Sequence, residues 1–76
     1  MNTVRFALPE PSPVRLAIYN QMGNEIRLLV SGSLPAGEHL AQWDGRDDSG
    51  RLADCGVYFY RLDSPSFHEV RKLLRH

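Results

Sequence analysis

The sequence predicts an all-β protein, a small antiparallel β-sandwich of six to seven short strands. Apolar and polar residues alternate along most of its 76 residues, which is the period-2 pattern of half-buried strands. Glycine, proline, asparagine and aspartate interrupt this alternation at short intervals, as turns between strands do. No segment gives a convincing helical pattern. We therefore expect two facing sheets joined by short turns.

The first two strands are expected at residues 3–8 and 14–19, where apolar residues occupy every second position. Pro9, Pro11 and Pro13 end the first strand, because proline lacks the amide that a strand ladder requires. The turn after the second strand contains Gly23, which can adopt a positive φ.

The third strand is expected at residues 26–30. Leu29 makes its middle apolar on both sides, which indicates burial on both faces or a nearby bulge. A short helix at 25–30 is the alternative, but the run is too short and glycine and proline flank it. Residues 31–37 are interpreted as a loop that crosses between sheets.

Residues 37–43 form the fourth strand, with His39, Ala41 and Trp43 on one face. Trp43 is the best candidate for the centre of the core, since a buried indole removes roughly 150–250 Å² from water. A polar turn at 44–51 follows, in which Gly45 and Gly50 supply conformations that cost other residues energy. Leu52 and Ala53 add a brief extended piece.

Residues 57–63 are rich in β-formers and apolar on both faces, which is typical of a central strand. Gly56 opens this strand. After a tight connection at 64–66, the last strand is expected at 67–74. Its charged residues favour an edge position, because charge discourages pairing with another chain.

Composition limits the classes of function. The length of the chain, residues 1–76, allows a single domain with a modest core. The formal net charge is zero, which favours a protein partner over nucleic acid or an anionic membrane. No apolar run is long enough for a transmembrane helix, so no membrane insertion is expected, and the start lacks the layout of a signal peptide.

Several motifs recur in the order and spacing of one known family. They are VRFALP at 4–9, VRLAIYN at 14–20, MG at 22–23, AGEH at 36–39, WDGRD at 43–47, GR at 50–51, GVYFYRL at 56–62 and RKLL at 71–74. Together they resemble the immunoglobulin-like domain of flagellar hook-capping proteins and the related C-terminal sorting domains of type IX secreted proteins.

This resemblance implies an immunoglobulin-like β-sandwich at the C-terminus of a larger secreted or cell-surface bacterial protein. We expect a non-catalytic sorting or attachment module, recognised by the export machinery through its last strand. The expected partner-binding residues are Phe67, Arg71, Lys72, Leu73 and Leu74. The expected structural residues are Trp43, Asp44, Gly45, Gly50, Gly56 and Tyr58. A structural scaffold domain of an extracellular, hook-cap-like assembly is the alternative, and a carbohydrate-binding accessory module is a further one.

Other residues that carry chemistry are better explained by structure. Asp44, Asp47, Asp48 and Asp54 lack the spacing of an EF-hand calcium loop, so we expect the aspartates to cap turns, with calcium binding as the alternative. His39, His68 and His76 are too scattered for zinc. No motif frames a nucleophile, so neither an enzyme nor a cofactor is predicted.

Two further interpretations concern side-chain burial. Cys55 is interpreted as a buried small hydrophobe, because it directly precedes a strand, with an exposed thiol as the alternative. The aromatic rings of Tyr19, Tyr58, Phe59 and Tyr60 are interpreted as core that fills both faces of a sandwich, with a binding platform as the alternative.

Overall fold

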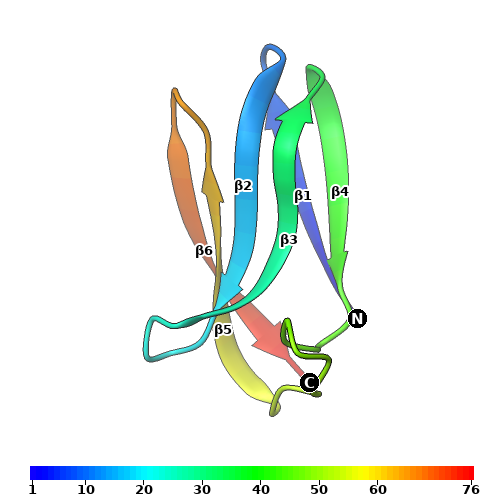
Figure 1. Cartoon of the computed structure of the whole chain (residues 1–76), viewed down its shortest axis with the longest axis vertical. Helices are drawn as coiled ribbons and strands as arrows, with labels where there is room; N and C mark the ends of the chain where they lie inside the picture. Colours follow the sequence, from blue (N-terminus) through cyan, green and yellow to red (C-terminus); the bar gives the residue numbers. More distant parts are fainter.

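The computed structural model describes all residues from 1 to 76 and contains six β-strands (Figure 1). The strands are β1 (Asn2–Leu8), β2 (Ser12–Tyr19), β3 (Glu25–Leu34), β4 (Gly37–Trp43), β5 (Gly56–Asp63) and β6 (His68–Arg75). No helix in the chain has the length and apolarity needed to cross a membrane.

The strands form two antiparallel sheets of unequal size. β1 pairs with β4, and the other four strands pair in the order β3-β2-β5-β6. The predicted all-β sandwich is therefore confirmed, with six strands. The central position of β5 and the edge position of β6 are also as the sequence predicted.

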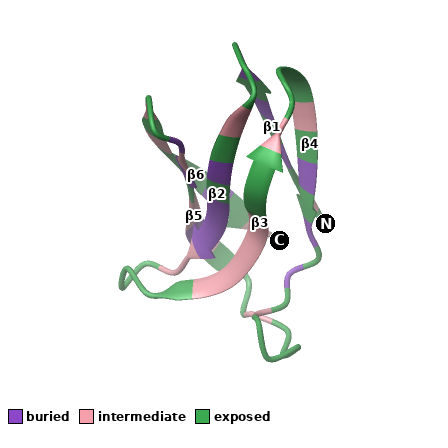
Figure 2. Cartoon of the chain, turned by 45° about the horizontal axis from the view of Figure 1, so that its top comes forward, coloured by how far each residue is buried: buried purple, intermediate pink, exposed green.

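The side chains that form the core come from alternate residues of the strands. Figure 2 colours the chain by burial, with the buried residues in purple. One cluster joins the inner rows of β1 and β2 to Leu62 of β5. The second joins Ile18, Trp43, Tyr58 and Leu73. The largest fully buried side chain is that of Trp43, with no exposed surface. In β1, β2 and β4 the inner face is thus the one that the alternation indicated.

β3 differs from the expected strand in length and regularity. Its pairing with β2 shifts register between Leu16 and Ala17 and again between Ile18 and Tyr19. The first shift places Leu29 at a bulge. Of the two explanations offered by the sequence, burial on both faces or a nearby bulge, the structure therefore has the bulge. The side chain of Leu29 packs against both clusters. The predicted loop at 31–37 is wrong, because Ser31 to Leu34 continue the ladder with β2.

Two boundary predictions also change. Pro13 lies inside β2 rather than before it. The pairing of β2 with β5 begins only at Arg15, so Pro13 has a neighbouring strand, β3, on one side only. Phe67 lies in the turn before β6, and its half-buried ring packs against the first cluster.

One burial interpretation is wrong, and another is right for Tyr58 and Tyr60, which lie in or against the core, but not for Phe59. Cys55 is exposed, because it lies in a bend before β5 where strand alternation does not yet apply. The aromatic residues do not fill both faces of β5 equally: Tyr58 points into the core, whereas Phe59 lies half-buried on the outer face, which no second sheet covers.

We predict that Trp43→Ala lowers the free energy of unfolding by about 3–5 kcal/mol, as deletion of a large buried aromatic side chain does. Denaturant melts followed by circular dichroism measure this loss. The matched control is Leu40→Ala on the same strand, whose side chain is 62% exposed and should change stability little. A loss below about 1 kcal/mol for Trp43→Ala would mean that the indole is not central to the core.

Candidate functional site

The turn at 44–51 is held by aspartate side chains that bind backbone amides. Asp44 accepts from the amide of Arg46 at 3.0 Å. Asp47 accepts from the amides of Ser49 and Arg51 at 2.9 and 3.0 Å. These carboxylates act as turn caps, because a short acidic side chain can replace a backbone acceptor locally.

The same turn is anchored to the edge of β3. The amide of Asp48 donates to the carbonyl of Ile26 at 2.8 Å, and the carboxylate of Asp48 accepts from the amide of Leu28 at 3.1 Å. Arg27 also donates to the carbonyl of Arg46 at 3.3 Å. The turn therefore covers backbone groups that an edge strand would otherwise leave open.

Glycine is required at two positions of this turn. Gly45 and Gly50 have φ values of +84° and +88°, a region that costs other residues energy. A Cβ at Gly45 would also lie 2.5 Å from Nε of Arg75. The turn thus closes tightly against the last residues of the chain.

The polar atoms of two buried aromatic side chains form hydrogen bonds with the backbone of the loops. Trp43 and Tyr58 meet edge to face, with ring centroids 5.1 Å apart. The indole Nε1 donates to the carbonyl of Arg46 at 2.8 Å, and the Tyr58 hydroxyl donates to the carbonyl of Asp54 at 2.6 Å. Gly56, with φ of +143°, follows at the start of β5.

The five expected partner-binding residues do not form one surface. Leu73 is buried in the second cluster and Phe67 is half-buried against the first. Arg71 lies opposite Tyr60 on the inner side of β6, whereas Lys72 and Leu74 lie on the outer side. Because the side chains of a strand alternate, a contiguous stretch of sequence is divided between two faces.

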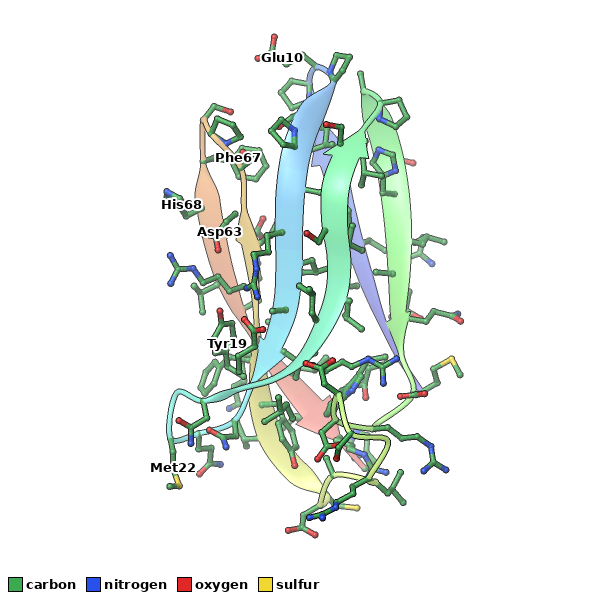
Figure 3. All side chains as sticks on the ribbon, in the orientation of Figure 1. Glu10, Tyr19, Met22, Asp63, Phe67 and His68 are labelled. Atoms are coloured by element: carbon green, nitrogen blue, oxygen red, sulfur yellow. The ribbon has the colours of Figure 1, made fainter.

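The outer face of the four-stranded sheet carries two polar clusters that sequence reasoning missed. Arg15 on β2 binds Glu25 on β3 through two hydrogen bonds of 2.5 and 2.7 Å, and Tyr19 donates to the same carboxylate. Asp63 accepts from Arg61 at 2.9 Å and contacts His68 at 2.6 Å (Figure 3). The pairing of β2 with β3 and of β5 with β6 brings Glu25 and His68 to their partners, which alternation in the sequence alone does not reveal. Arg61 and Asp63 are two residues apart on β5 and so share one face.

These contacts shift the affinity of several groups for protons. The hydrogen bond from Arg15 lowers the pKa of Glu25, and the reciprocal bond raises the pKa of Arg15. Burial acts to raise the pKa of Asp63, but hydrogen bonds from Arg61 and His68 outweigh it, so the net shift is downward. Both carboxylates are therefore held ionised as partners of arginine.

The three tyrosines do not form one platform for a sugar. Tyr58 is buried in the core. Tyr60 pairs with Ile18 and so points inward, while Tyr19 pairs with Phe59 on the outer face. Of the histidines, His39 stacks on Phe6 at 5.4 Å and donates to the carbonyl of Pro35 at 2.7 Å. No group of three histidine, cysteine, aspartate or glutamate residues is arranged to hold a metal ion.

Comparison with known families adds one finding. The family model described as FlgD Ig-like domain matches residues 2–65, a range that covers β1 to β5. No curated protein and no solved structure matches the chain.

We predict that Asp47→Asn reduces the acid sensitivity of the fold. The hydrogen bond from Ser49 is the main cause of the lowered pKa of Asp47. The ionised carboxylate therefore stabilises the fold above the unfolded-state pKa of about 4, and this contribution is lost as pH falls through the lower folded-state value. Asparagine keeps an acceptor oxygen but does not titrate.

Thermal melts from neutral pH to below pH 4 provide the measurement for this variant. The melting temperature of wild type should fall more steeply in acid than that of Asp47→Asn. Glu38→Gln, which changes an exposed carboxylate on β4, is the matched control and should follow wild type. Parallel curves for wild type and Asp47→Asn would contradict the prediction.

Proposed function

The chain belongs to the FlgD Ig-like domain family of flagellar hook-capping proteins, and on this premise we propose that it is a non-catalytic structural module of a protein assembly. The module presents a rigid β-sandwich whose surfaces contact protein partners. Neither a cofactor nor nucleic acid takes part, and the assembly lies outside the cell. The observation that carries this proposal is the family match over residues 2–65.

The positions of the chain ends support a role as a projecting module. The N- and C-termini lie at the same end of the sandwich, away from the β1–β2, β3–β4 and β5–β6 connections (Figure 1). The side chain of Asn2 donates to the carbonyl of Leu74 at 2.8 Å, which ties the two ends together. A sandwich held in this way can be attached at one end and extend its other end toward a partner.

The charged side chains also support a structural role. Asp44 and Asp47 bind backbone amides of their own turn. Glu25 binds Arg15 on the neighbouring strand, and Asp63 binds Arg61 on its own strand. Each of these carboxylates thus helps to hold the sandwich together. This is the role that charged side chains have in a structural module.

A role in type IX sorting stays a prediction that rests on sequence resemblance. The segment expected to be recognised, β6, lies outside the residues that match the family. Within it, Leu73 is buried in the core, so recognition of its side chain would require β6 to leave the sheet. The structural role has no such requirement and is therefore the one we favour.

We predict that the purified chain forms complexes larger than its 8.6 kDa monomer as its concentration rises, because association follows mass action. Light scattering coupled to size-exclusion chromatography, from micromolar to millimolar protein, measures this. A constant monomer mass would count against assembly through copies of this chain.

Export of a reporter distinguishes the structural role from the sorting role. Residues 1–76 are fused to a folded reporter and expressed in a cell with type IX secretion. Under the structural role the fusion stays inside the cell, whereas export of the folded fusion would support sorting. The same fusion with Trp43→Ala, which destabilises the fold, tests whether export requires a folded module.

A further inference from the structure

The two sheets of the sandwich do not cover each other completely. Within the four-stranded sheet, Arg71 is directly opposite Tyr60, and Glu69 is directly opposite Leu62. Directly opposite residues of an antiparallel pair point to the same face. Leu62 is buried, with 1% of its surface exposed, so Glu69 and Arg71 also point toward the inner side.

Despite this orientation, the inner side of β6 is open at its N-terminal half. The side chain of Arg71 is 65% exposed and that of Glu69 is 34% exposed, and the two form an ion pair with each other. Leu73, two residues further on, is buried beside Trp43. The smaller sheet therefore covers the C-terminal half of β6 and leaves the other half without a facing strand.

Within the smaller sheet, β1 is the strand on the side of β6, since β4 contacts β3. Near the chain termini the side chain of Asn2 reaches the carbonyl of Leu74 on β6. Toward the other end β1 and β6 diverge, as both ribbon views show (Figures 1 and 2). Since β1 pairs with β4 alone, its other edge faces the divergence.

The strand edges of the molecule are not equally protected. The turn at 44–51 binds backbone groups of β3 at Ile26 and Leu28, and β6 carries four charged side chains. β1 has one charged side chain, that of Arg5, and neither a bulge in its pairing nor a proline. By these criteria β1 and β4, which has Glu38 as its one charged residue, are more open to the addition of another strand than β3 or β6. The other side of β4 contacts β3, so β1 has the free edge toward β6.

We propose that the free edge of β1 binds an extended segment of a partner protein, which adds a third strand to the smaller sheet and covers the open inner side of β6. This inference rests on the proposed structural function and names the way in which a partner is held. Main-chain hydrogen bonds supply affinity in such strand addition, and alternate side chains supply specificity.

The surroundings of the added strand define its chemistry. Its inward side chains would lie over Tyr60, the half-buried Phe67 and the stem of Arg71, whose charged head is paired with Glu69. Apolar residues are favoured there, because an arginine stem can lie under apolar side chains while its head stays paired. Its outward side chains would lie beside Arg5, which is exposed and belongs to none of the ion pairs of the chain. An acidic residue opposite Arg5 gives the favourable cross-strand pair.

A second copy of this chain does not match that chemistry. β1 contains no acidic residue, so pairing of two β1 strands would bring two Arg5 side chains close together without a counter-charge. The inner face of β4 is occupied by the core of its own sandwich and cannot also cover β6. The occupant is therefore a segment that is not yet part of a sheet.

The probe for this proposal is a synthetic peptide of seven residues, the length of β1. Valines occupy alternate positions, and threonine and a central glutamate occupy the others. A second peptide has lysine in place of glutamate. Binding to the full chain is followed by nuclear magnetic resonance, through amide hydrogen exchange in β1 and chemical shifts of Tyr60, Glu69 and Arg71.

We expect the glutamate peptide to slow exchange at alternate amides of β1 and to shift the signals of Arg71 and Tyr60. In Arg5→Glu its dissociation constant should rise at least about threefold, and the lysine peptide should become the tighter ligand, as the energy of a cross-strand charge pair implies. Lys72→Glu makes the same change of charge on the outer side of β6 and should bind like wild type.

Several results would overturn the proposal. These are no slowing of exchange in β1 at millimolar peptide, slowing in β4 or β6 instead, or equal affinities of wild type and Arg5→Glu. Protection of β1 in the chain alone, together with a doubled mass, would show that a second copy is the occupant. If Arg5→Glu does not fold, equal binding of the two peptides to wild type contradicts the proposal.

The peptide experiment on β1 and the light-scattering experiment on the proposed function can fail independently of each other. Association of the chain in light scattering without any protection of β1 would reject strand addition and leave the structural role in place. Protection of β1 by the peptide in a chain that stays monomeric would support strand addition and direct the search to a different partner protein.

Discussion

Burial of the Trp43 indole is the constraint on which the rest of the structure depends. Its ring lies between the sheets against Tyr58, and its N–H must find an acceptor because a buried donor without one is costly. The carbonyl of Arg46 supplies that acceptor. The chain therefore has to fold back over the indole directly after β4, which sets the path of the turn at 44–51.

This path has consequences for the remaining strands. Asp44 and Asp47 stabilise the turn, and Asp48 attaches it to β3. The hydroxyl of Tyr58 holds the segment that enters β5 through the carbonyl of Asp54. Core and loops are thus connected by a few hydrogen bonds between polar atoms of aromatic residues and the backbone, which gives a small sandwich with one cysteine well-defined loops without an internal disulfide.

The unequal sheets explain why function is to be sought at strand edges. Two strands cannot cover four, so part of the inner side of β6 remains open, and the two-stranded sheet has two edges of its own. A protein that serves as a structural module has use for such edges, because they bind other chains through main-chain hydrogen bonds. Membership of the FlgD Ig-like domain family agrees with a structural role of this kind.

The sequence by itself determined that strands occupy most of the chain, the inward faces of β1, β2 and β4, the place of Trp43 and the glycine-dependent turn, because alternation and turn chemistry are local properties. Only the tertiary structure decided the division into two and four strands, the exposure of Cys55 and the pairing of Arg15 with Glu25. It also decided that the outer face of β5 stays uncovered although Val57 and Phe59 are apolar. Alternation assigns residues to two faces of a strand, but which face another sheet covers depends on contacts between residues far apart in the chain.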